Sequence, residues 1–415
     1  MAQYKSVRGM HDIMPEETGK WQYAEKIIVE TVKLFNYKEL RTPVIEQQAL
    51  FERSIGSDSD IISKEMYAFQ DKKGRNLALR PEGTASVVRA FIEAGMSTAK
   101  NTTRLYYYGP MFRYDRPQKG RYRQFYQFGV ELLGSASPFS DGEVIEILDT
   151  IIKNLGIQNY YFGINTLGCT NCKSRYREKI KDYIGSIEEN LCQDCKIRAA
   201  KSPLRILDCK NSQCRQLIKN ITSIDAVLCK QCSIHFQDVL QYLQKAQITY
   251  NIQPNLVRGL DYYTRTVFEV YLKDDNNAIA AGGRYDMLVK ELGGEDVPAV
   301  GFAIGMERLL SLMTKPIPVE PVVYFICIGG EARNVGIDIA RNMRKQGISV
   351  EMDYDDRPLQ SALKMADRQQ VPWCVILGQR EMEKGVILLK KMDTGLQEEV
   401  KIDIFIQRFK EMLRC

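Results

Sequence analysis

The spacing of apolar residues predicts three helices in the N-terminal part of the chain. Apolar residues from Trp21 to Phe35 recur close to the helical period, and a strongly amphipathic run extends from Asp141 to Leu155. A shorter segment, from Ala85 to Ala94, has the same character. Each of these segments is expected to present one apolar face.

Segments rich in aromatic and β-branched residues predict strands between and after these helices. Pro43 excludes a helix from YKELRTPVIE, and a turn at Lys73–Gly74 separates two short strands. Two longer strands, RLYYYGPMFRYD and RQFYQFGVELLG, flank the loop RPQKGRY. The segments NLVRGLDYYTRTVFEVYL and AVGFAIGMERLL are also predicted to be β-rich, the second with a helical end.

The C-terminal part has a different pattern. The Pro-rich segment TKPIPVEP, residues 314–321, is predicted to be a linker. After it, the strand-like runs VVYFICI, ISVEMDY, WCVILG and VILLKKM alternate with helices predicted over Ala332–Gln346, over Leu359–Gln370 and from about Asp403. Alternating strands and helices predict a small α/β domain over residues 322–415.

Composition and charge narrow the class of protein. The chain has 415 residues, of which 44% are hydrophobic, enough for two or three domains. It has no run of about 20 apolar residues and no secretory signal at its N-terminus, so no membrane association and a cytoplasmic location are expected. Between Cys169 and His235 there are 13 Lys and Arg against 7 Asp and Glu, whereas the rest has 45 against 45. This local excess is typical of a phosphate-binding patch or of a solvated basic face.

Eight of the eleven cysteines lie in this basic segment and form four closely spaced pairs. The spacing suits two tetrahedral zinc sites of four thiolates each, while free buried thiols and disulfides remain alternatives. The segment, residues 169–235, is predicted to be a helical insertion between strands. The four pairs are Cys169/Cys172, Cys192/Cys195, Cys209/Cys214 and Cys229/Cys232.

Cations and aromatic residues are concentrated in the segment FRYDRPQKGRYRQFYQFGVE, residues 112–131. Arginine grips phosphate or carboxylate with a planar fork, and aromatic faces stack on nucleobases. A structural hairpin needs neither feature, so the segment indicates a site for a flat polyanion. Its cations are Arg113, Arg116, Lys119, Arg121 and Arg123.

This segment resembles motif 2 of the class II aminoacyl-tRNA synthetases, and VGFAIGMERL resembles motif 3. RGLDYYTRTVFEV and AGGRYDMLV resemble the two signatures peculiar to the histidyl-tRNA synthetase family, and RGMHDIMPEE and LRPEGTASVVRA fit the same family. The resemblance covers essentially the whole chain. It implies an α+β fold: an antiparallel β-sheet catalytic domain over residues 1–313, interrupted by the insertion, and a C-terminal α/β anticodon-binding domain.

The resemblance also implies an activity. A histidine–tRNA ligase activates L-histidine with ATP to histidyl-adenylate and transfers it to the 3′ end of tRNA(His). Mg²⁺ would accompany ATP, and a homodimer would be built partly on the Trp21–Glu46 region. Zinc is not part of the family's core chemistry.

Site residues follow from the matching motif positions. Arg113 is expected on the α-phosphate, Arg258 at the carboxylate–phosphate junction and Arg308 on the far phosphates, with Arg113 and Arg258 as catalytic residues. ATP would also contact Arg121 and Phe125. The residues expected around histidine are Glu82, Thr84, Arg113, Gln127, Glu131, Arg258, Tyr262 and Tyr263.

Other functions remain to be weighed against this one. A regulatory paralogue of histidine biosynthesis keeps the catalytic fold but lacks the anticodon-binding domain and loses active-site residues, both of which are intact here. A zinc-bearing nucleic-acid binder would explain the basic insertion but not Glu82 or Glu131. The insertion itself is hypothesised to hold the acceptor arm of tRNA(His) without touching ATP or histidine.

Overall fold

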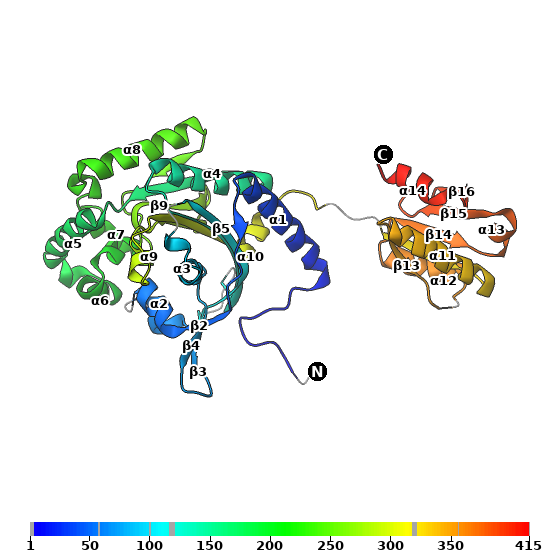
Figure 1. Ribbon diagram of the computed structural model, residues 1–415, viewed down its shortest axis with the longest axis horizontal. Coiled ribbons are helices and arrows are strands. Elements are labelled where there is room, and N and C mark those ends of the chain that lie inside the picture. The colour runs from blue at the N-terminus through cyan, green and yellow to red at the C-terminus, as the bar shows by residue number, and fades with distance from the viewer. Residues whose placement is uncertain are drawn as a thin grey trace. The chain divides into compact units, whose positions relative to one another are not determined.

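The chain divides into two compact units, Met1–Pro316 and Ile317–Cys415 (Figure 1). The computed structural model describes residues 4–56, 59–98, 101–115, 121–317, 322–355 and 357–414. Residues 318–321 of the expected linker and residues 116–120 of the motif 2 loop lie outside this description. Among the helices that are described, none is long and apolar enough to cross a membrane.

An eight-stranded sheet forms the centre of the first unit, in the order β1-β5-β6-β11-β10-β9-β7-β8. All neighbouring pairs are antiparallel except β1 with β5 and β7 with β8. This sheet confirms the expected α+β catalytic fold. The strands are β1 Lys38–Glu39, β5 Thr103–Phe112, β6 Gln124–Leu133, β7 Tyr160–Thr166, β8 Tyr250–Ile252, β9 Thr264–Leu272, β10 Asp275–Arg284 and β11 Ala299–Gly305.

Helices cover the two faces of this sheet differently. One face packs against α1 (Pro15–Leu34), α4 (Pro138–Asn154), α8 (Lys230–Lys245) and α10 (Met306–Leu312) in one apolar cluster. The other face carries α3 (Thr84–Glu93), α9 (Leu288–Glu291) and the insertion. A small sheet of β2 Ile45–Gln47, β4 Asn76–Leu79 and β3 Ala68–Gln70 lies next to α2, Gln48–Ile55, as Figure 1 shows.

The predicted helices are present, with shifted boundaries. The first begins at Pro15 rather than Trp21, because proline suits the first helical position and Glu16 and Glu17 favour the first turn. The insertion contains α5 Thr170–Gly185, α6 Gln193–Lys201 and α7 Ser212–Ile218, joined by 3₁₀ turns. Helix α8 starts in the insertion and continues past His235, where the Tyr242 hydroxyl donates to Glu146 of α4 at 2.5 Å.

The strand prediction for NLVRGLDYYTRTVFEVYL was wrong in its first half. Residues 264–272 form β9, but residues 255–263 are a loop. Side chains bond the backbone of this loop in place of strand neighbours: Asn165 of β7 donates to the Leu256 carbonyl at 3.0 Å, and Lys173 donates to the carbonyls of Asp261 and Tyr263. Strand β10 was not predicted, because DDNN and the Gly pair resemble turns; β9 and β11 hold it on both sides.

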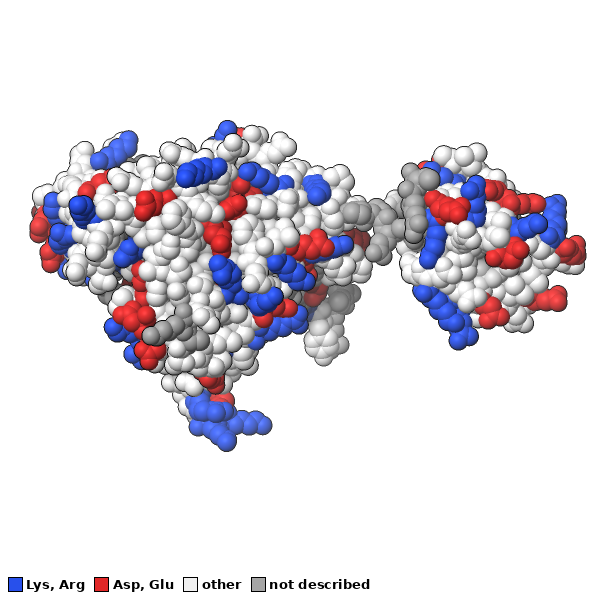
Figure 2. Space-filling model, turned by 45° about the horizontal axis from the view of Figure 1, so that its top comes forward, with Lys and Arg blue, Asp and Glu red and all other residues white. Residues whose placement is uncertain are grey.

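The second unit is a five-stranded sheet in the order β13-β12-β14-β15-β16, with helices on its faces. The first three strands are parallel and the last two antiparallel, which confirms the predicted α/β pattern. Figure 2 shows acidic and basic side chains interspersed on both units, with Lys and Arg projecting at the tip of the β3–β4 hairpin. The elements are β12 Val322–Cys327, α11 Gly330–Lys345, β13 Ser349–Met352, α12 Leu359–Arg368, β14 Trp373–Leu377, α13 Gln379–Lys384, β15 Val386–Lys391, β16 Gln397–Lys401 and α14 Phe405–Arg414.

Candidate active site

Strand alternation brings the predicted motif 2 residues to one face of the sheet. On β6, Phe128, Val130 and Leu132 pack into the cluster under α1 and α4. Because side chains of a strand alternate between faces, Gln127 and Glu131 point to the opposite face, the one that carries α3. The same rule places Tyr107 of β5 on that face, and its burial in the second apolar cluster agrees.

The Glu131 carboxylate lies at the centre of this face and is 1% exposed. It accepts a hydrogen bond from the Thr84 hydroxyl at 2.7 Å and another from the Tyr285 hydroxyl. Burial raises the pKa of Glu131 to about 8; the two hydroxyl donors oppose this shift and the nearby Glu82 carboxylate adds to it. Gly301 faces Glu131 on β11, and a Cβ there would overlap the carboxylate.

Glu82 lies beside this group at the N-terminus of α3. Its carboxylate accepts from the backbone N–H groups of Thr84 at 2.7 Å and Ala85 at 2.9 Å. Burial raises the pKa of Glu82 while these N–H donors lower it. A carboxylate in this place stabilises the helix start and retains lone pairs for a ligand.

Tyrosine side chains surround the two carboxylates. The rings of Tyr262 and Tyr263 lie 4.6 Å apart, and Tyr262 contacts Tyr285 edge-on at 5.7 Å between centroids. The Tyr107 hydroxyl donates to Gln127 at 3.4 Å. We call the whole set the buried polar cluster; its members are Glu82, Thr84, Tyr107, Gln127, Glu131, Tyr262, Tyr263 and Tyr285.

Arg113 borders this cluster at the end of β5. Its Nε donates to the carbonyl of Pro81 at 2.8 Å, and its guanidinium lies 5.3 Å from the centroid of the Phe125 ring. Burial lowers the pKa of Arg113, and the charges of Glu65 and Glu82 oppose that shift. The cation is therefore held between a carboxylate of the cluster and an aromatic face.

Arg258 borders the cluster from the loop before β9. Its guanidinium pairs with Glu269 and lies 5.8 Å from the centroid of the Tyr263 ring. Its Nε is buried and has no hydrogen-bond partner among the described residues. A buried donor without a partner costs free energy, so it is available to a ligand anion.

The other two predicted arginines lie in different surroundings. Arg308 pairs with Asp275 at 2.7 Å and is 25% exposed, and Arg121 pairs with Asp115 at 3.2 Å and is half exposed. The structure thus joins Arg113, Phe125 and Arg258 to the buried polar cluster, while the recorded ion pairs of Arg308 and Arg121 lie with other residues. Arg116 and Lys119 fall outside the described residues.

Tyr285 is the site residue that sequence reasoning missed. It follows Arg284 in the signature AGGRYDMLV. Arg284 itself is fully buried and pairs with Asp141 while donating to the carbonyls of Ser135 and Ser137, so it anchors the strand end that carries Tyr285. A single tyrosine directly after a buried arginine belongs to no apolar or alternating period that would reveal it in the sequence.

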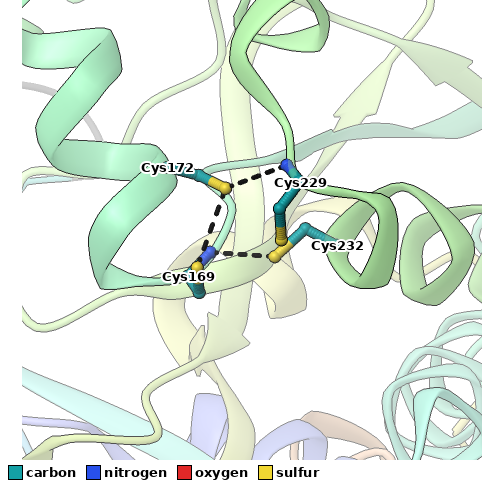
Figure 3. A group of neighbouring side chains, drawn as sticks. All are labelled: Cys169, Cys172, Cys229 and Cys232. Carbon is teal, nitrogen blue, oxygen red and sulfur yellow. Dashed lines mark hydrogen bonds between the residues drawn. The ribbon is translucent and has the colours of Figure 1, made fainter.

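The eight paired cysteines form two groups, and in each the sulfur atoms all lie within 4.8 Å of one another. The root cluster joins the two ends of the insertion: Cys169 and Cys172 at the start of α5 meet Cys229 and Cys232 at the start of α8, and Figure 3 shows these side chains turned toward one another. The distal cluster, within the insertion, consists of Cys192, Cys195, Cys209 and Cys214.

Sulfur separations in both clusters suit a tetrahedral metal site. Cys169 Sγ and Cys172 Sγ lie 3.7 Å apart, and Cys192 Sγ and Cys209 Sγ 3.8 Å. Zinc–sulfur bonds of about 2.3 Å in a tetrahedron place sulfurs about 3.8 Å apart, whereas a disulfide needs about 2.05 Å. All ten described cysteines are free, so the disulfide alternative is not realised.

Backbone N–H groups stabilise the sulfurs of the root cluster reciprocally. Cys169 N–H donates to Cys232 Sγ at 3.1 Å, and Cys229 N–H donates to Cys172 Sγ at 3.2 Å. Such donors favour the thiolate form that binds a metal. The distal cluster has the equivalent contact from Cys192 N–H to Cys214 Sγ at 3.2 Å.

Comparison with known families supports the sequence resemblance. The family model for histidyl-tRNA synthetase matches residues 9–171 and 197–309, and the anticodon-binding domain matches residues 322–412. The interval between the two halves of the first match, residues 172–196, contains Cys172, Cys192 and Cys195. The second match covers the domain that the regulatory paralogue lacks.

Individual proteins are similar over nearly the full length. The histidine–tRNA ligase of Halothermothrix orenii is 44% identical, with 99% of each chain covered, and that of Thermotoga petrophila is 45% identical, with 98% of each covered. Among solved structures, apo histidyl-tRNA synthetase of S. aureus superposes with a TM-score of 0.83 at 34% identity, covering 98% of this chain and 100% of that one.

Proposed function

The chain belongs to the histidyl-tRNA synthetase family of class II aminoacyl-tRNA synthetases and is a histidine–tRNA ligase, and we propose that its buried polar cluster binds histidine while Arg113 and Arg258 promote adenylate formation. The observation that carries this proposal is the Glu131 carboxylate, buried between two hydroxyl donors on the face that Arg113 and Arg258 border. The reaction joins the histidine carboxylate to the α-phosphorus of ATP, and pyrophosphate leaves. The 3′ end of tRNA(His) then attacks the adenylate, and AMP leaves.

Selection of histidine rests on the carboxylate and phenols of the cluster. Imidazole offers one N–H donor when neutral and two when protonated, and the Glu131 carboxylate can accept one of them. Tyr263 and Tyr262 lie on the adjoining loop, within the same group of rings. An apolar analogue would leave these buried groups unpaired, so it should be rejected by up to ~10⁴-fold.

The α-ammonium and carboxylate groups of histidine would be held by other residues of the site. Glu82 keeps lone pairs for the α-ammonium group, and Gln127 and Thr84 can each contribute an acceptor oxygen. Arg258, whose Nε lacks a partner, would bind the carboxylate where it meets the α-phosphate. Arg113 would bind the α-phosphate itself, where negative charge grows in the transition state.

The outer phosphates are assigned to Arg308 and Arg121, and the adenine ring to Phe125. Both arginines are already paired with carboxylates at part-exposed positions, and such pairs contribute only about 0–1 kcal/mol. Each arginine can therefore exchange its carboxylate partner, Asp275 or Asp115, for a phosphate oxygen at little cost in free energy. Mg²⁺ would neutralise the same phosphates, bound chiefly by ATP and water.

Histidine-dependent ATP–pyrophosphate exchange tests this assignment. Wild-type protein should exchange pyrophosphate only with histidine present, and Glu131→Gln should raise the KM for histidine with little change in the KM for ATP. Gln70→Glu, on an exposed strand of the small sheet, is the matched amide–carboxylate control and should have no effect. Exchange without histidine, or an equal rise in both KM values, would contradict the role of Glu131.

We also propose one structural zinc ion in each four-cysteine cluster. The four soft donors, the sulfur separations and the N–H···S contacts support zinc, and a reducing cytoplasm would keep the cysteines available as thiols. Metal analysis of the purified full-length chain should give two zinc ions per chain. No zinc in protein purified without chelator would reject this proposal.

A homodimer is proposed on the Trp21–Glu46 region. Strand β1 is an edge strand of the large sheet, and the neighbouring Leu34 and Ile45 are exposed apolar residues. An edge strand and exposed apolar side chains are features that a second copy would cover. Sedimentation should give a dimer that Leu34→Glu weakens, and a wild-type monomer would reject the proposal.

A further inference from the structure

The insertion makes a direct contact with the loop that carries the histidine signature. The Lys173 ammonium donates to the carbonyl of Asp261 at 2.7 Å and to that of Tyr263 at 3.0 Å. These carbonyls flank Tyr262 and stand three and five residues after Arg258 in the loop over residues 255–263, which we call the catalytic loop. The insertion therefore contacts the backbone of this loop, while the expectation that it does not touch histidine or ATP stays a prediction.

Lys173 is well placed to determine the shape of this loop. The loop has no strand partner, and the Asp261 N–H makes only a 3.5 Å contact to the Ile55 carbonyl. Each backbone carbonyl that is not paired in a sheet needs another donor when it is buried.

The root cluster in turn determines where Lys173 lies. Lys173 follows Cys172 directly, and its N–H donates to the Cys169 carbonyl at 2.9 Å in the first turn of α5. That turn is tied to α8 by the sulfur contacts of Cys172 and Cys169 with Cys229 and Cys232. The position of the ammonium therefore depends on how the four sulfurs are held together.

The chain just before the root cluster is paired with the start of β9, directly after the catalytic loop. Leu167 N–H donates to the Arg265 carbonyl at 2.7 Å, and Arg265 N–H donates to the Gly168 carbonyl at 2.7 Å. The cluster and the loop thus share a rigid connection on one side and the Lys173 contact on the other.

The distal cluster reaches the catalytic part by other contacts. Its segment packs in one apolar cluster with Leu256 and Val257 of the catalytic loop, and Asp208 lies close enough to Arg258 and Glu269 for their charges to interact. Its segment reaches Asp60 through Arg198 at 3.7 Å and Arg205 at 3.2 Å. The Asp60 side chain is 38% exposed, so solvent screens both ion pairs. The two clusters therefore differ in the kind of contact they make with the site: next to the root cluster, Lys173 donates hydrogen bonds to the backbone of the catalytic loop, whereas the distal segment contributes apolar packing and charge interactions.

We propose that Lys173 is a positioning residue for histidine activation and that a zinc ion in the root cluster holds it in place. The proposal has two parts. The metal half, that a zinc ion in the root cluster holds Lys173 in place, rests on the zinc proposed above. The Lys173 half, that Lys173 positions the catalytic loop, does not depend on zinc. Zinc at the root cluster would order the loop that presents Arg258, Tyr262 and Tyr263. Loss of that ion would loosen the loop while leaving the ATP contacts of Arg113 and Phe125 in place.

Steady-state pyrophosphate exchange of the full-length chain tests the Lys173 half. Lys173→Met should lower kcat/KM for histidine about tenfold, with the KM for ATP, the zinc content and Tm close to wild type. Lys173→Arg should restore most of the loss, because it keeps a cation with several donors. Lys181→Met, on an exposed position of the same helix, is the matched control and should match wild type.

Wild-type kinetics in Lys173→Met would overturn the positioning role. So would an equal loss in Lys181→Met, or a loss that Lys173→Arg fails to relieve.

Single cysteine variants test the metal half. Cys172→Ser and Cys195→Ser should each retain one zinc per chain, but the loss in kcat/KM for histidine should be clearly larger for Cys172→Ser. The double variant Cys172→Ser/Lys173→Met should be no worse than the more impaired single variant, because both substitutions act on one contact. Equal losses in the two cysteine variants, or additive losses in the double variant, would overturn control by the root cluster. An absence of zinc from wild-type protein would reject the metal half alone, because the Lys173 variants test the positioning role of Lys173 independently.

Discussion

The inner and outer arginines of the active site differ in their surroundings. Arg113 and Arg258 lie against carboxylates and aromatic rings in the interior, and Arg258 keeps a donor without a partner. Arg308 and Arg121 lie nearer solvent and are paired with Asp275 and Asp115. An inner cation is fixed before substrate arrives and acts in a low dielectric, whereas an outer one must exchange partners in water. The same residue type should therefore contribute very differently to the rate.

The largest effect is expected at the inner site. Arg258→Ala should lower the rate of pyrophosphate exchange about 10²–10³-fold, equivalent to ~2.7–4 kcal/mol, because its cation opposes charge that develops in the transition state. Arg75→Ala, at the exposed hairpin turn, is the control and should have no effect. A fall of only a few-fold for Arg258→Ala would remove the distinction between inner and outer arginines.

Tyr285→Phe tests how much the hydroxyl group that donates to Glu131 contributes to histidine binding. It removes a hydroxyl that donates to Glu131, and a buried polar group that loses its hydrogen-bond partner costs about 1–3 kcal/mol. The KM for histidine should rise roughly tenfold or more in initial-rate measurements, with the KM for ATP unchanged. If both KM values rise together, Tyr285 supports the fold rather than histidine binding.

The pKa of Glu131 predicts a pH dependence that the outer arginines cannot produce. Because the pKa is raised to about 8, the carboxylate form predominates only above that pH in the free enzyme. If the carboxylate accepts the imidazole N–H, kcat/KM for histidine should rise with pH by up to about tenfold per unit below pH 8 and then level off. Glu131→Gln should lack this rise, and identical profiles for both proteins would contradict the assignment.

The smallest effect is expected at the outer arginines. Arg308→Ala should raise the KM for ATP at most about fivefold, or ~1 kcal/mol, because it exchanges one screened contact for another. The effect should shrink further at high salt. Asp275→Asn, which removes the competing carboxylate, should lower the KM for ATP slightly; a rise would show that Asp275 positions Arg308 rather than competing with phosphate.

The fold was predictable where a pattern is local. The apolar residues of helix α4 recur with the helical period, and the aromatic residues of the motif 2 segment indicate its two strands. Strand β10 was not predictable, because its polar and glycine residues are held in place by neighbours distant in the sequence. Such tertiary support overrides local propensity.

The candidate site was predictable only as a set of motif positions. Glu131 and Arg258 were identified by resemblance. Their partners in the structure, Tyr285 just after β10 and Glu269 in β9, carry no local sequence signal that predicts these pairings. The same limit applies to the cysteines. Their spacing indicated pairs, but only the structure shows that the first pair joins the last one.

This closure of the first cysteine pair on the last has a consequence for how the insertion can change over time. The chain leaves the sheet after β7 and returns through α8 to β8, which is the parallel neighbour of β7. With the root cluster joining the point of departure to the point of return, the intervening residues form a loop that is closed independently of its length. Lengthening such a loop costs little additional entropy, about 0.6 kcal/mol per doubling. Residues between Cys172 and Cys229 can therefore be gained, lost or rebuilt as a module while the flanking strands keep their register.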